Sequence, residues 1–91
     1  MSFVLTFTPK GFTASQYDEV IKQLYAAGAG APKGRRYHVC YGDLNGVQVI
    51  DVWDSLEEFQ AFGQTMVPLM LSLGADPGQP EIKEVHNIII G

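Results

Sequence analysis

The sequence predicts an α+β fold of the ferredoxin-like type, with the element order βαββαβ and a four-stranded antiparallel sheet in the order 4-1-3-2. Three observations support this prediction. Between Gly46 and Gly74 a buried strand runs directly into an amphipathic helix. Both predicted helices start with capping signals, and an Asn45-Gly46 pair between two apolar runs is typical of a hairpin. Because crossover connections are right-handed, both helices are expected on one face of the sheet.

The first strand and the first helix follow each other near the start of the chain. Residues 2–8, SFVLTFT, are apolar and β-branched, and a Pro-Lys-Gly turn closes the run. Thr13 and Gln16 form a capping box, in which the threonine oxygen accepts a hydrogen bond from the third helical amide. We therefore expect a helix over residues 14–27. Its apolar side chains recur every three or four residues, at Tyr17, Val20, Ile21, Leu24 and Tyr25, and Phe12 and Tyr17 occupy the staple positions.

A glycine-rich loop and a hairpin are predicted next. Residues 28–36, GAGAPKGRR, contain three glycines and a proline and cannot continue a helix or a strand. The second and third strands are expected at residues 37–42 and 47–53, joined by a turn over Asp43-Leu44-Asn45-Gly46, in which Asn45-Gly46 is the strongest hairpin signal.

The position of this turn sets which residues face each other across the hairpin. With Asn45-Gly46 as the turn, His38 lies opposite Trp53 and Cys40 lies opposite Asp51. All four side chains then share one face of the sheet, whereas a loop one residue longer or shorter would separate them.

The second helix begins after Ser55, its predicted cap, with Glu58 at the third helical position, and it ends at Gly74. Pro68 lies inside it, and we expect a kink or a short break there because proline lacks an N–H and clashes with the preceding turn. A last strand is expected at residues 81–90.

Length and composition predict a single soluble domain over residues 1–91. Apolar residues make up 46% of the chain and charged residues 18%, and no stretch approaches the roughly 18 apolar residues of a membrane span. A net charge of −4 argues against nucleic acid as a partner, because binding to phosphates needs clustered Lys and Arg. The first residues lack the pattern of an export signal, so none is expected. Cys40 is the only cysteine, which fits a reducing cytoplasm.

The distribution of apolar residues also predicts a homodimer. The third and fourth strands do not alternate cleanly between apolar and polar residues, so both faces of the sheet are expected to be covered. The two helices can cover only one of them. We therefore expect the other face to pack against a second copy of the chain, which would also stabilise so small a domain.

The stretch VIDVWDSLEEFQAF, followed by Pro68, Gly74 and EVHNIII, resembles the antibiotic-biosynthesis monooxygenase-like group of dimeric α/β barrels. The resemblance covers nearly the whole chain in element order, and its most specific residues are Trp53, Ser55 and Phe59. It implies a dimer in which two sheets form a shared barrel and each subunit has a cavity between helices and sheet.

The resemblance implies an activity as well as a fold. Some members of the group are cofactor-independent oxygenases of polyphenolic rings, others degrade heme, and many have no known activity. The second helix contains no histidine that could serve as an axial heme ligand. We therefore expect a dimer whose cavity binds a small aromatic or apolar molecule, and cofactor-independent monooxygenation is the reaction that the resemblance implies for it. The alternative is a non-catalytic ligand-binding or structural dimer.

His38 and Asp51 are the candidate catalytic residues. An imidazole titrates near neutral pH and can act as a general base, and a neighbouring carboxylate can hold its tautomer. Asp51 is the one charged residue in an apolar strand, and burying a carboxylate is costly unless it is paired. The structural alternatives are a histidine bonded to a backbone carbonyl and an aspartate paired with Arg35, Arg36 or a tyrosine.

Six further residues are candidates for ligand binding: Trp53, His86, Arg35, Arg36, Phe59 and Met66. The resemblance implies that Trp53 lines the cavity. The arginines and Lys33 could close over an anionic ligand, although solvated loop charges are the simpler interpretation. Met66 could form an adaptable wall or pack in the core. No metal site is expected, because the two histidines fall on opposite edges of the predicted sheet without a third ligand.

Overall fold

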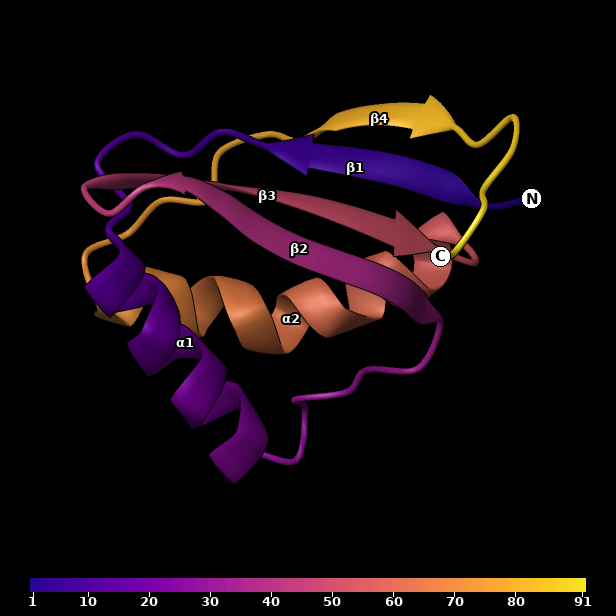
Figure 1. Ribbon diagram of the computed structural model, residues 1–91. Coiled ribbons are helices and arrows are strands. Elements are labelled where there is room, and N and C mark those ends of the chain that lie inside the picture. Colours follow the sequence, from indigo (N-terminus) through magenta and orange to yellow (C-terminus); the bar gives the residue numbers. More distant parts are fainter.

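The computed structural model describes residues 1–91 and has the predicted element order. The elements are β1 (Phe3–Phe7), α1 (Ala14–Ala26), β2 (Arg35–Asp43), β3 (Gly46–Trp53), α2 (Leu56–Ser72) and β4 (Glu81–Glu84). The strands form one antiparallel sheet in the order β2-β3-β1-β4, which is the predicted order read from the opposite edge. Both helices lie on the same face of the sheet (Figure 1). The ferredoxin-like α+β fold is therefore confirmed.

Helix α1 begins and ends as its sequence predicts. The Gln16 amide donates to the Thr13 hydroxyl oxygen at 3.1 Å, and the Thr13 amide donates to the Gln16 side-chain oxygen at 2.9 Å, which completes the capping box. At the other end Gly28 has a φ of 78°, and the Ala29 amide donates to the Leu24 carbonyl at 2.8 Å. This bond spans the last turn, and the positive φ makes glycine the suitable residue there.

Helix α2 continues through Pro68 as one helix, so the expected short break is wrong. Its start agrees with the prediction, because the Glu58 amide donates to the Ser55 hydroxyl oxygen at 3.2 Å. Pro68 removes the hydrogen bond that the Gln64 carbonyl would otherwise accept. Both residues are exposed, so water can bind that carbonyl and the helix continues.

The turn between β2 and β3 occupies the predicted segment, residues 43–46. Leu44 and Asn45 are its central residues, Asp43 pairs with Gly46, and neither central residue has a positive φ. The register that follows from a two-residue turn at Asn45-Gly46 is therefore wrong. The Leu44 carbonyl accepts a hydrogen bond from the Ala14 amide at 2.8 Å, so the start of α1 holds the turn in this position.

The observed turn moves the register of the hairpin by two residues. His38 pairs with Asp51 rather than Trp53, and Cys40 pairs with Val49 rather than Asp51. Because side chains alternate with a period of two, a shift of two residues leaves every side chain on the predicted face. The correction therefore brings His38 and Asp51 directly opposite each other.

Strand β4 is shorter than predicted, and His86 and the residues up to Ile90 do not belong to it. β4 pairs only with β1, and the last residue pair between the two strands is Phe3 with Glu84. One further bond, from the Val85 amide to the Ser2 carbonyl at 2.9 Å, ends the contact. Beyond that point the chain leaves the sheet (Figure 1).

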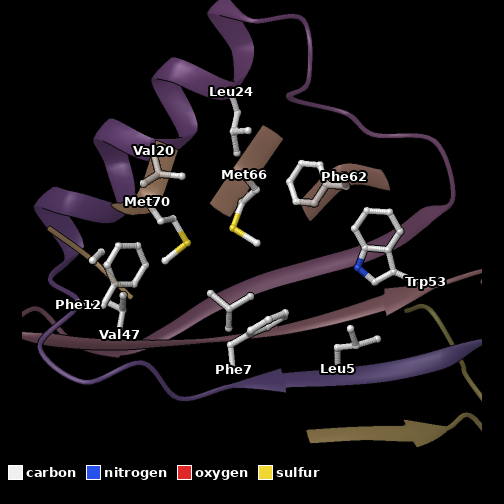
Figure 2. Close-up of a cluster of buried hydrophobic side chains, with 12 residues drawn as sticks. Leu5, Phe7, Phe12, Val20, Leu24, Val47, Trp53, Phe62, Met66 and Met70 are labelled. Atoms are coloured by element: carbon white, nitrogen blue, oxygen red, sulfur yellow. The ribbon is translucent and has the colours of Figure 1, made fainter. Parts of the chain in front are cut away.

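The hydrophobic core fills the space between the helices and the sheet. Side chains from β1 and β3 point toward those of α1 and α2, as Figure 2 shows for Leu5, Val20, Phe62 and Trp53. Leu5 and Trp53 are fully buried. The opposite face of the sheet has no helix over it, and Tyr37 on that face is 45% exposed. No helix has the length and apolar character that crossing a membrane requires.

Candidate functional site

A β-bulge at the start of β2 determines which charged residues face the helices. Arg35 pairs with Trp53, but Tyr37 pairs with Val52, so Arg36 is an extra residue in the strand. In a regular strand Arg35 and Tyr37 would share a face. The bulge instead turns Arg35 to the helix side, together with His38 and Asp51, and leaves Tyr37 on the other side.

These inward-facing residues border a cavity between the helices and the sheet. Its volume is about 60 Å³, and ten of its 14 lining residues are hydrophobic. They come from β1, α1, β2, β3 and α2 and from the segments before α1 and after α2: Phe7, Phe12, Tyr17, Val20, Ile21, Leu24, Arg35, His38, Val49, Asp51, Phe62, Met66, Met70 and Pro77. Four polar or charged side chains, Tyr17, Arg35, His38 and Asp51, therefore converge on an apolar space, as in a small-molecule site.

Three of the polar residues and a buried tryptophan form one chain of hydrogen bonds. The Trp53 Nε1–H donates to Asp51 Oδ2 at 3.2 Å, and Asp51 Oδ1 lies 2.5 Å from His38 Nδ1. His38 Nε2 lies 2.5 Å from the Tyr17 hydroxyl. Since a carboxylate only accepts, the Asp51 contact places the histidine proton on Nδ1. Nε2 is then the acceptor for the Tyr17 proton, which is the tautomer a general base at this position needs.

Burial affects the charged and titratable groups in this series of hydrogen bonds. Asp51 is 4% exposed, and its two hydrogen bonds offset the cost of burying a carboxylate. The pKa of the Tyr17 hydroxyl is raised to about 12, chiefly by burial and also by the nearby Cys40 and Asp51, while Arg35 opposes the change. Tyr17 is therefore a neutral phenol near pH 7 that can donate to His38 and pass a proton on. Every buried side-chain nitrogen and oxygen in the protein has a hydrogen-bond partner.

Arg35 lies at the edge of the cavity. Its Nη2 donates to the Gly30 carbonyl at 3.1 Å, and its guanidinium carbon lies 5.8 Å from the centre of the Phe62 ring. The segment that carries Gly30 is fixed at its other end, where the Asp54 amide donates to the Gly34 carbonyl at 2.7 Å. Gly34 has a φ of 90°, and a side chain there would collide with the Glu58 carboxylate.

The other predicted site residues lie elsewhere. Trp53 does not border the cavity: its indole is in the core, where it acts on the site through Asp51. Phe59 also lies outside the cavity, with its ring centroid 5.6 Å from that of Trp53 and 5.8 Å from that of Phe7. Arg36 forms an exposed ion pair with Asp54. His86 is exposed and follows β4, so it lies away from His38.

Sequence reasoning missed Tyr17 as a site residue. Its position on the apolar stripe of the first helix indicated packing, and its ring does pack edge-on against Phe12 with the centroids 6.3 Å apart. The overlooked signal is its hydroxyl, because a buried tyrosine usually has a hydrogen-bond partner. No group of three or more His, Cys, Asp or Glu side chains is arranged to hold a metal ion.

A second, wider groove adjoins the cavity on the side of α2. It is lined by α2 and by residues 77–80, and Phe7, Met66 and Pro77 line both the groove and the cavity. These three side chains therefore form the wall between the two spaces. Two of them, Met66 and Phe7, are buried, and a methionine side chain can change rotamer without disturbing its backbone.

Comparison with known proteins identifies the fold. No family model matches the sequence, and no curated protein is significantly similar to it. SnoaB, a cofactor-independent oxygenase from Streptomyces nogalater, superposes with a TM-score of 0.62 at 18% identity, over 97% of this chain and 94% of its own. The protein YJCS superposes with a TM-score of 0.65 at 10% identity, over 94% of this chain and 100% of its own.

A candidate antibiotic biosynthesis monooxygenase from Chloroflexus aurantiacus has the same fold, with a TM-score of 0.57 at 18% identity over 99% of this chain and 97% of its own. The fold of the antibiotic-biosynthesis monooxygenase-like proteins is therefore confirmed for this chain. At such identities the likeness concerns the fold alone, and the chemistry must be argued from the residues of the site.

Proposed function

We propose that the protein is a cofactor-independent monooxygenase that removes a proton from a small aromatic molecule held in the helix–sheet cavity. The observation that carries this proposal is the chain Asp51–His38–Tyr17, which ends in an apolar cavity. A reaction that begins with removal of a proton needs a base at the substrate, whereas a simple binding module needs only the apolar walls. The fold shared with SnoaB, described as a cofactor-independent oxygenase, supports the same conclusion.

The proposed base acts through its hydrogen bonds. Asp51 keeps the proton of His38 on Nδ1, so Nε2 can accept a proton. Tyr17 lines the cavity and its hydroxyl is bonded to Nε2, so it can take a proton from the ligand while giving its own to His38. Asp51 then stabilises the imidazolium that forms. Positioned general bases of this kind contribute roughly 10² to 10⁴ to a rate.

Oxygen chemistry without a cofactor requires that the substrate supply the electrons. Removing a proton from an activated ring CH₂ group leaves a carbanion, which transfers an electron to O₂ and recombines with it. Return of the proton gives a hydroperoxide, and loss of water leaves a ketone. The balance is R₂CH₂ + O₂ → R₂C=O + H₂O. The protein needs to provide the base, the orientation and a site that excludes water.

The cavity must open for an aromatic ligand to enter. Its volume of about 60 Å³ is well below the roughly 150 Å³ of an apolar cavity that holds benzene. Met66 and Met70 line it, and both side chains are flexible enough to yield to a ring. Movement of Met66 would join the cavity to the groove beside α2.

Oxygen uptake with anthrone, which has an acidic CH₂ between two rings, tests the proposal. The wild type is expected to accelerate oxygen uptake over buffer and to form anthraquinone. His38→Ala is expected to lose this acceleration while remaining folded by circular dichroism, with a lower thermal unfolding temperature because the buried Asp51 loses a hydrogen-bond partner. His86→Ala, the second histidine of the chain, serves as the matched control. Equal rates for all three proteins, or a rate loss that follows a loss of folding, would refute the catalytic assignment.

We also propose a cytoplasmic homodimer formed through the face of the sheet that lies away from the helices. That face carries Tyr37 and Tyr41, 45% and 41% exposed, beside the half-buried Val39 and Ile50. An apolar face without a cover favours association, and dimerisation would stabilise a chain of this size. Val39→Asp is expected to yield monomers in sedimentation velocity, whereas Leu44→Asp in the exposed turn is not. A wild-type monomer at all concentrations would contradict the dimer.

A further inference from the structure

The cavity contains one cation, Arg35, that forms no ion pair with a carboxylate. The ion pairs of the protein are Arg36 with Asp54 and His38 with Asp51, and Arg35 takes part in neither. Of its five N–H donors, the structure pairs one, with the Gly30 carbonyl. Arg35 is partly buried and lies against the face of Phe62. A guanidinium in a half-buried, mostly apolar site is poorly compensated without an anion.

The backbone is built to place this charge in the cavity. Without the bulge at Arg36, Arg35 would project to the other face of the sheet, beside Tyr37. The extra residue turns Arg35 toward the helices, while Arg36 stays outside with Asp54. In a regular strand Arg36 would lie opposite Trp53 on the helix side, so the bulge determines that Arg35, and not Arg36, lines the cavity.

Arg35 and His38 also connect the cavity to the surface. Both residues line the interior cavity, and both line a shallow outer pocket together with Ala31, Pro32, Arg36 and Tyr37. The charge of Arg35 reaches the interior as well, since it lowers the pKa of Tyr17 against the larger effect of burial. A ligand at this edge can therefore contact the guanidinium and the Tyr17–His38 pair at once.

We infer that the cavity takes an aromatic ligand bearing an acidic oxygen, a carboxylate or a phenolate, which Arg35 binds. This inference rests on the proposed function only for the choice of cavity, and it names the substrate class of that site. The guanidinium fork matches the two oxygens of a carboxylate and also strengthens a hydrogen bond to a phenolate. With the anion at Arg35, the ring lies among Phe62, Val20 and Leu24, and the reacting position faces Tyr17.

Equilibrium binding without turnover tests the inference. The probes are benzoate and 2-naphthoate, each compared with its neutral amide, and the readout is calorimetry under nitrogen. The wild type is expected to bind at least one carboxylate about tenfold or more tightly than its amide, the scale of a charge-assisted hydrogen bond. Arg35→Gln is expected to lose this preference and to keep its affinity for the amide. Arg36→Gln, the neighbouring arginine, is expected to keep both.

Two further outcomes keep the result interpretable. If Arg35→Gln fails to fold by circular dichroism, Arg35→Lys replaces it and is expected to retain part of the preference, because the charge remains but the fork is lost. A carboxylate preference that survives in Arg35→Gln, or no preference in the wild type, would overturn the inference. Because calorimetry under nitrogen measures binding alone, its result does not depend on the oxygenase reaction. Selective binding by a protein that does not accelerate oxygen uptake would refute the proposed reaction and leave Arg35 as the anion site.

Discussion

Asp51→Asn is the substitution that best separates the catalytic account from a structural one. The amide has the shape of the carboxylate but carries no charge and offers two N–H donors. Its oxygen can still accept from Trp53 Nε1, as Asp51 Oδ2 does at 3.2 Å. Its NH₂ group then faces His38 Nδ1 and donates to it. The histidine proton moves to Nε2, which can no longer accept the proton of Tyr17.

The expected magnitudes follow from these contacts. Two hydrogen bonds to a charged group become neutral ones at a site that is 4% exposed, which costs about 1 to 2 kcal/mol of the free energy of unfolding. For a domain of this size that lowers the unfolding temperature by about 5 to 15 °C. The rate of proton abstraction is expected to fall by roughly 10² to 10⁴, because the base has the wrong tautomer.

The assay combines nitrogen NMR of the His38 ring with oxygen uptake on anthrone. The wild type is expected to show the proton on Nδ1 and the variant to show it on Nε2, with loss of turnover. Asp54→Asn, which affects only the exposed pair with Arg36, serves as the control and should change stability by less than about 1 kcal/mol. An Asp51→Asn protein with the wild-type tautomer and the wild-type rate would refute the role assigned to Asp51.

Three further substitutions test separate parts of the account. Tyr17→Phe removes the phenol whose pKa is raised to about 12. Because the folded wild type holds this proton more tightly than the unfolded chain, the stability of the wild type should fall as the pH rises from about 10 to 12. The variant should lack that fall when unfolding is measured as a function of pH. Met66→Ala should lower the free energy of unfolding by about 2 to 5 kcal/mol and tighten binding of 2-naphthoate, because it enlarges the cavity; denaturant unfolding and calorimetry measure the two effects. Thr13→Ala should cost about 1 kcal/mol in denaturant unfolding through loss of the capping box, without changing anthrone turnover.

The fold could be predicted because its signals are local. Capping residues, turn residues and apolar periodicity fixed the order of the six elements and the sheet order that follows from right-handed crossovers. The errors fall where local signals compete with distant partners. The turn at Leu44-Asn45 depends on a hydrogen bond from Ala14, and the length of β4 depends on where β1 stops pairing.

The site could be predicted only in part. Alternation along β2 and β3 placed His38 and Asp51 on one face, and an error of two residues in register preserves that face. Tyr17 could not be placed beside them, because the packing angle of a helix on a sheet is not encoded in its own periodicity. The inward turn of Arg35 depends on a bulge, and no residue in the sequence GRRYH indicates one.

Hydrogen–deuterium exchange of anthrone under nitrogen tests the central claim most directly, because it isolates proton removal from the reaction with oxygen. In D₂O the wild type is expected to accelerate exchange of the ring CH₂ protons over buffer, and His38→Ala is expected to show the buffer rate with its fold intact. His86→Ala should match the wild type. Exchange at the same rate with the wild type and with His38→Ala would contradict the assignment of His38 as the base of this cavity.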